Sequence, residues 1–222
     1  MKRFLKIIVV AILTWEAKHV LRKYKPFVIA VTGSVGKTST KDAIFEVVKG
    51  TVKARKSMKS FNSEIGVPLT VLGLENKWSS VFGWASNITQ GFFMVIFPSL
   101  YPQLLVLEVG ADHPGDIKRI TTWLSPDITV VTRIPDLPVH VEYFSSPEEV
   151  KKEKSELVKA LKSTGTFISN ADDAAVMGLA SLTRAHMVSY GFGETAMVRG
   201  SNPEVDYHER DDRMVPIGMK FN

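Results

Sequence analysis

The chain has 222 residues, of which 45% are hydrophobic and 23% are charged, the composition of a folded protein rather than a disordered one. It contains no cysteine, which excludes disulfides and thiolate metal sites. This fits a reducing compartment, so we expect a cytoplasmic protein. The length is enough for one large α/β domain with a short appendage.

Positive charge gathers at the start of the chain, within a formal net charge of +5. The charged residues there are Lys2, Arg3, Lys6, Lys18, Arg22, Lys23 and Lys25, with Glu16 as the single acid. Aromatic residues are not interleaved with these cations as they are on a base-stacking surface, so we expect no nucleic-acid partner. An anionic lipid surface fits the basic segment better.

An apolar run at 7–15 lies inside this basic segment. It lacks a small-residue cleavage pattern, and it is far shorter than the ~20 residues that span a bilayer. We therefore expect a helix over residues 1–26, followed by one domain over residues 27–222. The helix either packs on that domain or rests peripherally on a membrane, and both interpretations remain open.

From residue 27 onward, short apolar runs alternate with helical patterns. Strands are expected at 27–31, 104–107, 128–132, 166–169 and 187–190, and helices at 38–49, 113–124 and 172–182. A further helix begins after Ser146, a good N-cap, because Pro147 suits its first turn. This alternation predicts the α/β class, with a doubly wound, mostly parallel sheet.

Two segments do not fit that alternation. Residues 78–102 are apolar and aromatic, with Gly and Pro punctuation, and they predict a helical hairpin or a partner-facing surface. The tail is polar, and residues 214–221 predict a single edge strand.

A glycine-bearing turn between the first expected strand and helix reads TGSVGKTS over residues 32–39. Its glycines allow backbone N–H groups to surround phosphate oxygens at a helix N-terminus. The expected nucleotide-binding residues are Gly33, Ser34, Val35, Gly36, Lys37, Thr38 and Ser39. Lys37 is expected to contact the β and γ phosphates, and the Thr38 hydroxyl to bind Mg²⁺. The full pattern calls for one more glycine, where this chain has Val31.

The segment TGSVGKTSTK at 32–41 resembles the phosphate loop of the Mur ligases, as do FNSEIGVPL at 61–69 and EVGADHPGDI at 108–117. Further matches follow in family order at 125–127, 139–142, 153–156 and 170–173. Together they cover roughly residues 27–195. The resemblance implies a phosphate-loop nucleotide-binding fold and an ATP-dependent amide ligase of peptidoglycan synthesis. Within this family, the resemblance implies the ligases that join D-alanyl-D-alanine to a UDP-muramoyl peptide.

Three residues are candidate metal or catalytic groups besides the loop. Glu108 ends an apolar strand at the sheet edge where ligands bind, and a carboxylate there favours Mg²⁺. His140 follows the strand at 128–132, and the resemblance assigns it to a second Mg²⁺. Lys154 falls on the apolar stripe of its helix, where it either follows the rim or is buried. The resemblance implies that Lys154 is carbamylated and helps to hold the second metal.

Two further groups have open interpretations. Asn62 and Ser63, close to several basic residues, either bind an anionic substrate or belong to a solvated basic loop. Asp172 and Asp173 either belong to the family site or cap the following helix.

The chain also departs from the family pattern. Arg133 stands where the family has asparagine, and the uridine-nucleotide-binding, adenine-contacting and C-terminal segments of the family have no counterpart. Two hypotheses follow: an ATP-dependent amide ligase represented by its central domain, or a truncated nucleotide-binding module without ligase activity. The oligomeric state cannot be predicted from the sequence.

Overall fold

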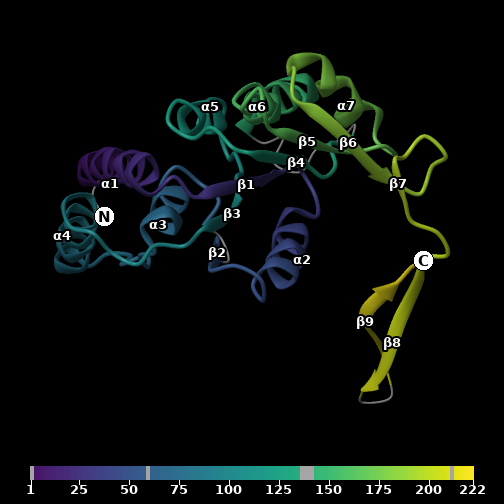
Figure 1. Cartoon of the computed structure of the whole chain (residues 1–222), viewed down its shortest axis with the longest axis horizontal. Coiled ribbons are helices and arrows are strands. Elements are labelled where there is room, and N and C mark those ends of the chain that lie inside the picture. The colour runs from purple at the N-terminus through teal and green to yellow at the C-terminus, as the bar shows by residue number, and fades with distance from the viewer. Residues whose placement is uncertain (1–2, 59–60, 136–142, 211–212) are drawn as a thin grey trace.

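The computed structural model describes residues 3–58, 61–135, 143–210 and 213–222 (Figure 1). Its centre is a seven-stranded sheet in the order β2-β3-β1-β4-β5-β6-β7. The strands are β1 (Phe27–Thr32), β2 (Ala54–Lys56), β3 (Leu104–Glu108), β4 (Ile128–Val131), β5 (Thr166–Asn170), β6 (His186–Gly191) and β7 (Val198–Arg199). Every neighbouring pair is parallel, which confirms the predicted doubly wound α/β class.

Helices cover both faces of this sheet, with α2 on the side opposite to α5 and α6 (Figure 1). They are α1 (Arg3–Tyr24), α2 (Lys37–Val48), α3 (Gly66–Leu72), α4 (Val81–Ile96), α5 (Asp116–Thr121), α6 (Pro147–Lys159) and α7 (Ala174–Met177), which continues into the 3₁₀ helix η2 (Gly178–Leu182). Ser146 caps α6 as expected, because its hydroxyl accepts the Glu149 amide.

Alternation along β1 divides the core into two layers. Val28 and Ala30 belong to a large cluster shared with α1, α3 and α5, whereas Ile29 and Val31 pack in a smaller cluster with Ile44 of α2. Both faces of the strand are therefore buried, as a continuous apolar run in a parallel sheet predicts. This burial on both faces fixes the position of β1 in the sheet, and with it the point where the loop after β1 begins.

Helix α1 is an integral part of the larger core layer. Val9, Leu13, Ala17 and Val20 on one of its stripes are at most 2% exposed, and α1 packs against α3 and α4. Of the two interpretations of residues 1–26, packing on the domain is confirmed. No helix in the described residues is both long and apolar enough to cross a bilayer.

The structure changes two expectations about irregular segments. Residues 78–102 contain one helix, α4, whose helical partner is α1, so the expected helical hairpin is wrong, while the alternative of a partner-facing surface stays a prediction. The tail forms β8 (Glu204–Arg210) and β9 (Arg213–Lys220), an antiparallel hairpin with its own two-stranded sheet. Residues 214–221 are thus mostly strand, but they pair with β8 instead of the edge of the main sheet, from which the hairpin stands apart (Figure 1).

A carboxylate is buried between α1 and α4. Glu16 is 1% exposed, and its Oε2 has no hydrogen-bond partner among the described residues. It packs on Gly91 so closely that a Cβ at that position would lie 2.1 Å from Oε2. Burial raises the pKa of Glu16 to about 7, so this carboxyl stays protonated in the folded chain under mildly acidic conditions.

This raised pKa predicts a pH-dependent stability. The unfolded chain releases the Glu16 proton near 4.5 while the folded chain holds it to about 7, so stability falls as pH rises between these values. Glu16→Gln removes this dependence, and relative to the original chain it should gain about 2–3 kcal/mol between pH 4.5 and pH 7.5. Urea unfolding at several pH values measures the difference. Glu75→Gln, at an exposed carboxylate, is the control, and equal curves for Glu16→Gln and the original chain would contradict the assignment.

Candidate functional site

The loop after β1 has the geometry of a phosphate-binding turn. Gly33 and Gly36 adopt φ values of +142° and +82°, which favour glycine. A Cβ at Gly33 would lie only 2.0 Å from Thr132 Oγ1. Gly36 is the N-cap of α2 and has no side chain to cap its first turn, so the N–H groups at that end are available to an anion.

Two hydrogen bonds tie this loop to the end of β4. The Ser34 amide donates to the Arg133 carbonyl at 2.7 Å, and the Thr132 hydroxyl donates to the Val35 carbonyl at 2.6 Å. Arg133 therefore contributes its backbone here, which any residue type provides. The Ser34 hydroxyl is buried without a partner in the described part of the chain, so it remains able to donate to a ligand.

The Thr38 hydroxyl and the Glu108 carboxylate meet at the carboxyl edge of the sheet. Thr38 Oγ1 donates to Glu108 Oε2 at 2.9 Å. The register of β1 against β3 explains the contact, because Val31 is opposite Glu108 and the loop begins two residues later. The sequence placed both groups at one edge, and the structure brings them into contact.

Lys41 is a site residue that sequence reasoning missed. It is 2% exposed on α2, and its ammonium group lies 3.9 Å from Glu108 Oε2 and 2.9 Å from the Ser57 carbonyl. The Ser57 hydroxyl in turn accepts the Glu108 amide at 3.0 Å. This cation offsets the cost of burying Glu108. The available signal was its spacing of four residues from Lys37, which puts both lysines on one side of α2.

Asn62 also contacts the carboxylate. Its side-chain amide donates to Glu108 Oε1 at 3.3 Å, and its backbone carbonyl accepts a hydrogen bond from the Gly110 amide at 2.8 Å. Ser63 lies beside it, where its carbonyl accepts the amide of Val67 in α3. Two of the nearby basic residues are already engaged: Arg55 donates to carbonyls of α3, and Lys56 pairs with Asp42 at 2.7 Å.

Lys154 is buried, as its position on the α6 stripe allows, with 5% of its surface exposed. Burial and then the positive charge of Lys37 lower the pKa of Lys154 to about 8. Burial also lowers the pKa of Lys37. Both lysines line one small pocket, formed by Ser34, Lys37, Asn62, Gly110, Ala111, Asp112, Phe144, Val150 and Lys154.

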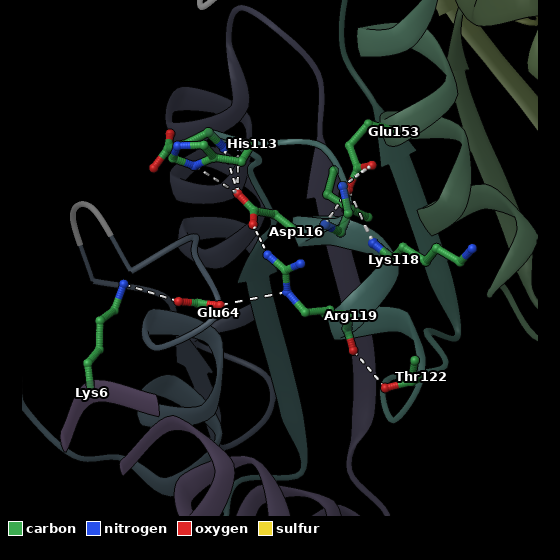
Figure 2. Close-up of polar contacts among 11 residues, drawn as sticks. Lys6, Glu64, His113, Asp116, Lys118, Arg119, Thr122 and Glu153 are labelled. Atoms are coloured by element: carbon green, nitrogen blue, oxygen red, sulfur yellow. Dashed lines mark hydrogen bonds and ion pairs between the residues drawn. The ribbon is translucent and has the colours of Figure 1, made fainter. Parts of the chain in front are cut away.

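The neighbouring Glu153 explains how α6 is held against α5. Its carboxylate accepts the amides of Gly115 at 2.8 Å and Ile117 at 2.6 Å, and thereby caps α5, whose own N-cap residue has no side chain. Figure 2 shows this cap and, near it, a network of ion pairs in which Glu64 lies between Lys6 and Arg119. The Glu153 cap fixes α6 in the orientation that directs Lys154 toward the pocket.

Two other candidates, Asp172 and Asp173, make their contacts away from this constellation, and His140 lies outside the described residues. Asp173 caps α7 through the Val176 amide and accepts the Ile134 amide at 2.7 Å, which agrees with the capping interpretation. Asp172 accepts hydrogen bonds from the amides of Phe192 and Gly193 and so anchors the loop after β6. These hydrogen bonds lower the pKa of the exposed Asp172 carboxyl.

The described residues suit a metal that is held partly by phosphate. They contain no group of three or more His, Asp and Glu side chains able to bind a metal alone. The adjacent Thr38 hydroxyl and Glu108 carboxylate are hard oxygen donors of the kind Mg²⁺ prefers. The donor chemistry therefore fits Mg²⁺, with ligand phosphates and water completing its shell.

The family model of the Mur ligase middle domain matches residues 96–220. The chain belongs to this family. The UDP-N-acetylmuramoyl-tripeptide–D-alanyl-D-alanine ligase of Mycobacterium bovis is 32% identical over 161 residues, which are 72% of this chain and 26% of that protein. The ligase of the same name from Bacillus subtilis is 31% identical over 157 residues, or 71% of this chain and 29% of that protein. The chain thus spans under a third of these relatives.

Solved structures share the Mur ligase fold. MurF from Acinetobacter baumannii superposes with a TM-score of 0.68 at 21% identity, covering 89% of this chain and 38% of that one. The MurF ligase of Thermotoga maritima in complex with ADP gives a TM-score of 0.67 at 22% identity, covering 96% and 44%. The parallel sheet and its helices are therefore those of a Mur ligase central domain.

The contact between Gly33 and Thr132 predicts the effect of a single methyl group. Gly33→Ala should lower the free energy of unfolding by about 1–3 kcal/mol, because it adds a clash and a strained φ. Gly50→Ala is the matched control, since a Cβ there meets nothing within 4 Å, and it should change stability by less than about 0.5 kcal/mol. Urea titration compares them, and equal midpoints would contradict the described loop geometry.

Proposed function

We propose that this chain is the nucleotide-binding part of an ATP-dependent carboxylate–amine ligase of peptidoglycan precursor synthesis. The observation that carries the proposal is the convergence of Thr38, Glu108, Lys37 and Lys154 at one sheet edge beside an uncapped helix N-terminus. The names of the relatives support a D-alanyl-D-alanine-adding reaction on a UDP-muramoyl tripeptide. Because the chain spans 26–29% of those relatives, the substrates and the complete activity are part of the proposal.

In this proposal the phosphate loop binds ATP. The amides of the loop and the first turn of α2 surround the phosphates, the Ser34 hydroxyl donates to them, and Lys37 lies against the β and γ phosphates. Thr38 and Glu108 would hold Mg²⁺, whose charge would offset the negative charge of the transferring phosphoryl group. A substrate carboxylate attacks the γ phosphate to give an acyl phosphate and ADP, and an amine then displaces phosphate to form the amide.

Carbamylation of Lys154 is the second part of the proposal. Its lowered pKa, about 8, provides neutral amine near physiological pH. The Nζ lone pair attacks the carbon of CO₂, an N–C bond forms, and one proton is released to solvent. The resulting anion relieves repulsion between Lys154 and Lys37, which now line one pocket as two cations. With His140, it would hold a second Mg²⁺.

We also propose a cytoplasmic location and a peripheral membrane contact through residues 1–25. The basic composition of that segment supports the contact, as do the exposed apolar side chains of Ile7, Ile8 and Trp15. The proposed division is a helix at 1–26 appended to a domain at 27–222, and the packing of α1 in the core supports their folding as one unit.

Replacing Lys37 tests the ligase reaction. In a phosphate-release assay with ATP, Mg²⁺, UDP-muramoyl tripeptide and D-alanyl-D-alanine, the intact gene product should release phosphate only when both substrates are present. Lys37→Ala should lower that rate at least ~100-fold, because one preorganised cation is lost. Lys49→Ala, at an exposed position of the same helix, is the control. ATP binding without substrate-dependent release would favour the nucleotide-binding module instead.

Carbamylation predicts a spectroscopic signal that does not depend on activity. With ¹³C-bicarbonate, the protein should show a carbamate ¹³C resonance that is lost in Lys154→Ala and kept in Lys159→Ala on the exposed side of the same helix. The signal should fade as pH drops well below 8, since the protonated amine does not react. A resonance that survives in Lys154→Ala would assign the carbamate to another amine.

A further inference from the structure

The outward face of α4 is apolar, which is unusual for a helix at the surface of a protein. Its exposed positions include no charged residue, and the polar ones are only Ser86, Thr89 and Gln90. The large apolar side chains that remain exposed there are Val81, Phe82, Phe92, Phe93 and Ile96, of which Phe82 is 90% exposed. The opposite side of α4 packs on α1, where Gly91 faces Glu16, and Trp84 is buried, so burial in the core explains only one face.

The apolar face continues past the C-terminal end of α4. Phe97 is 54% exposed and stacks on Phe93, and Leu100 is 91% exposed. A contiguous exposed set of this kind marks a docking surface. We call it, from Val81 to Leu100, the α4 surface.

One cation of α1, Lys23, borders the α4 surface directly. The ammonium group of Lys23 donates to the carbonyls of Val95 at 2.9 Å and Phe97 at 2.7 Å, so its charge lies at the end of α4. The one acid in α1 is Glu16, which is buried, and α4 contains none. Charges exposed on this pair of helices are therefore positive.

A basic pocket lies on the other side of α1. It has a volume of about 300 Å³ between α1, the start of β1 and the end of α5. Its lining includes Lys18, Arg22, Lys25 and Lys162 and no acidic residue. Among the described residues only Lys162 of these four forms an ion pair, with Asp127 at 2.6 Å. The pocket suits an anionic headgroup.

The apolar α4 surface and the cations of α1 together favour one kind of binding partner over another. A second copy of the chain would bring like-charged rims together, which disfavours self-association. An anionic bilayer matches both parts, because its acyl region accepts aromatic side chains and its headgroups attract lysine and arginine. The C-terminal end of the α4 surface lies near the beginning of β1, because Tyr24 contacts Ser99, whereas the phosphate loop follows the carboxyl end of β1. A bilayer there leaves the phosphate loop open to solvent.

We propose that the α4 surface and the basic end of α1 together form a docking site for an anionic lipid bilayer. The proposal deepens the peripheral membrane contact proposed above and adds α4 to its apolar part. It is independent of the ligase reaction. The protein lies on the bilayer without crossing it, with aromatic side chains of α4 in the interface and cations of α1 at the headgroups.

Vesicle co-sedimentation of the full chain tests the docking site. The original chain should bind vesicles of phosphatidylcholine and phosphatidylglycerol at 3:1 at least ~10-fold more strongly than phosphatidylcholine alone, and less strongly as salt rises. Phe82→Glu with Phe93→Glu should weaken binding at least ~10-fold, and Lys18→Glu with Arg22→Glu should remove the preference for anionic lipid. Val47→Glu with Met197→Glu, at positions 79% and 63% exposed, makes the same charge change elsewhere and should bind normally.

Each other outcome would overturn the docking site. Equal binding by the α4 variant and its control would place the contact elsewhere, and no binding to anionic vesicles would exclude a bilayer. A dimer in light scattering that the α4 variant converts to monomers would assign the surface to contacts between copies. Circular dichroism verifies that each variant is folded. The α4 variant should keep substrate-dependent phosphate release, so failure of docking and failure of the ligase proposal are separate results.

Discussion

The register between β1 and β3 is the constraint on which the site depends. Because Val31 pairs with Glu108, the glycine turn leaves β1 beside the carboxylate that ends β3. The Thr38 hydroxyl then reaches Glu108 from the first turn of α2. A shift of one residue would turn Glu108 to the other face of the sheet and separate a hard oxygen pair suited to Mg²⁺.

Around this contact, the fold buries several charged side chains, among them Lys41, Glu108, Glu153 and Lys154. Lys41 lies close to Glu108, and Glu153 uses its charge to cap α5, so each is compensated locally. Lys37 and Lys154 differ, because they line one pocket with lowered pKa values. Two cations in one pocket favour a negative group there, either a bound phosphate or a carbamate on Lys154. This preference for negative charge agrees with the proposed phosphoryl transfer.

The pair formed by α1 and α4 gives the domain a second specialised region. One side of each helix completes the core, and Glu16 fits against Gly91 where no larger residue has room. The remaining side of α4 is aromatic and uncharged, while α1 adds cations. The proposed docking site includes the end of α4 near the beginning of β1, whereas the proposed nucleotide site follows the carboxyl end of that strand.

The sequence by itself determined the α/β class, the positions of β1, β3, β4, β5 and β6, and the loop residues from Gly33 to Thr38, but not the short edge strands β2 and β7. Local signals suffice there, since buried parallel strands are continuous apolar runs and the phosphate turn requires glycine. Only the tertiary structure decided that Lys41 stands beside Glu108, that Glu153 caps a different helix and that α4 pairs with α1. These contacts join residues distant in the chain, through register and helix packing that no local pattern encodes. The tail shows the same limit: residues 214–221 were recognisable as strand, but their partner was set by the hairpin with β8.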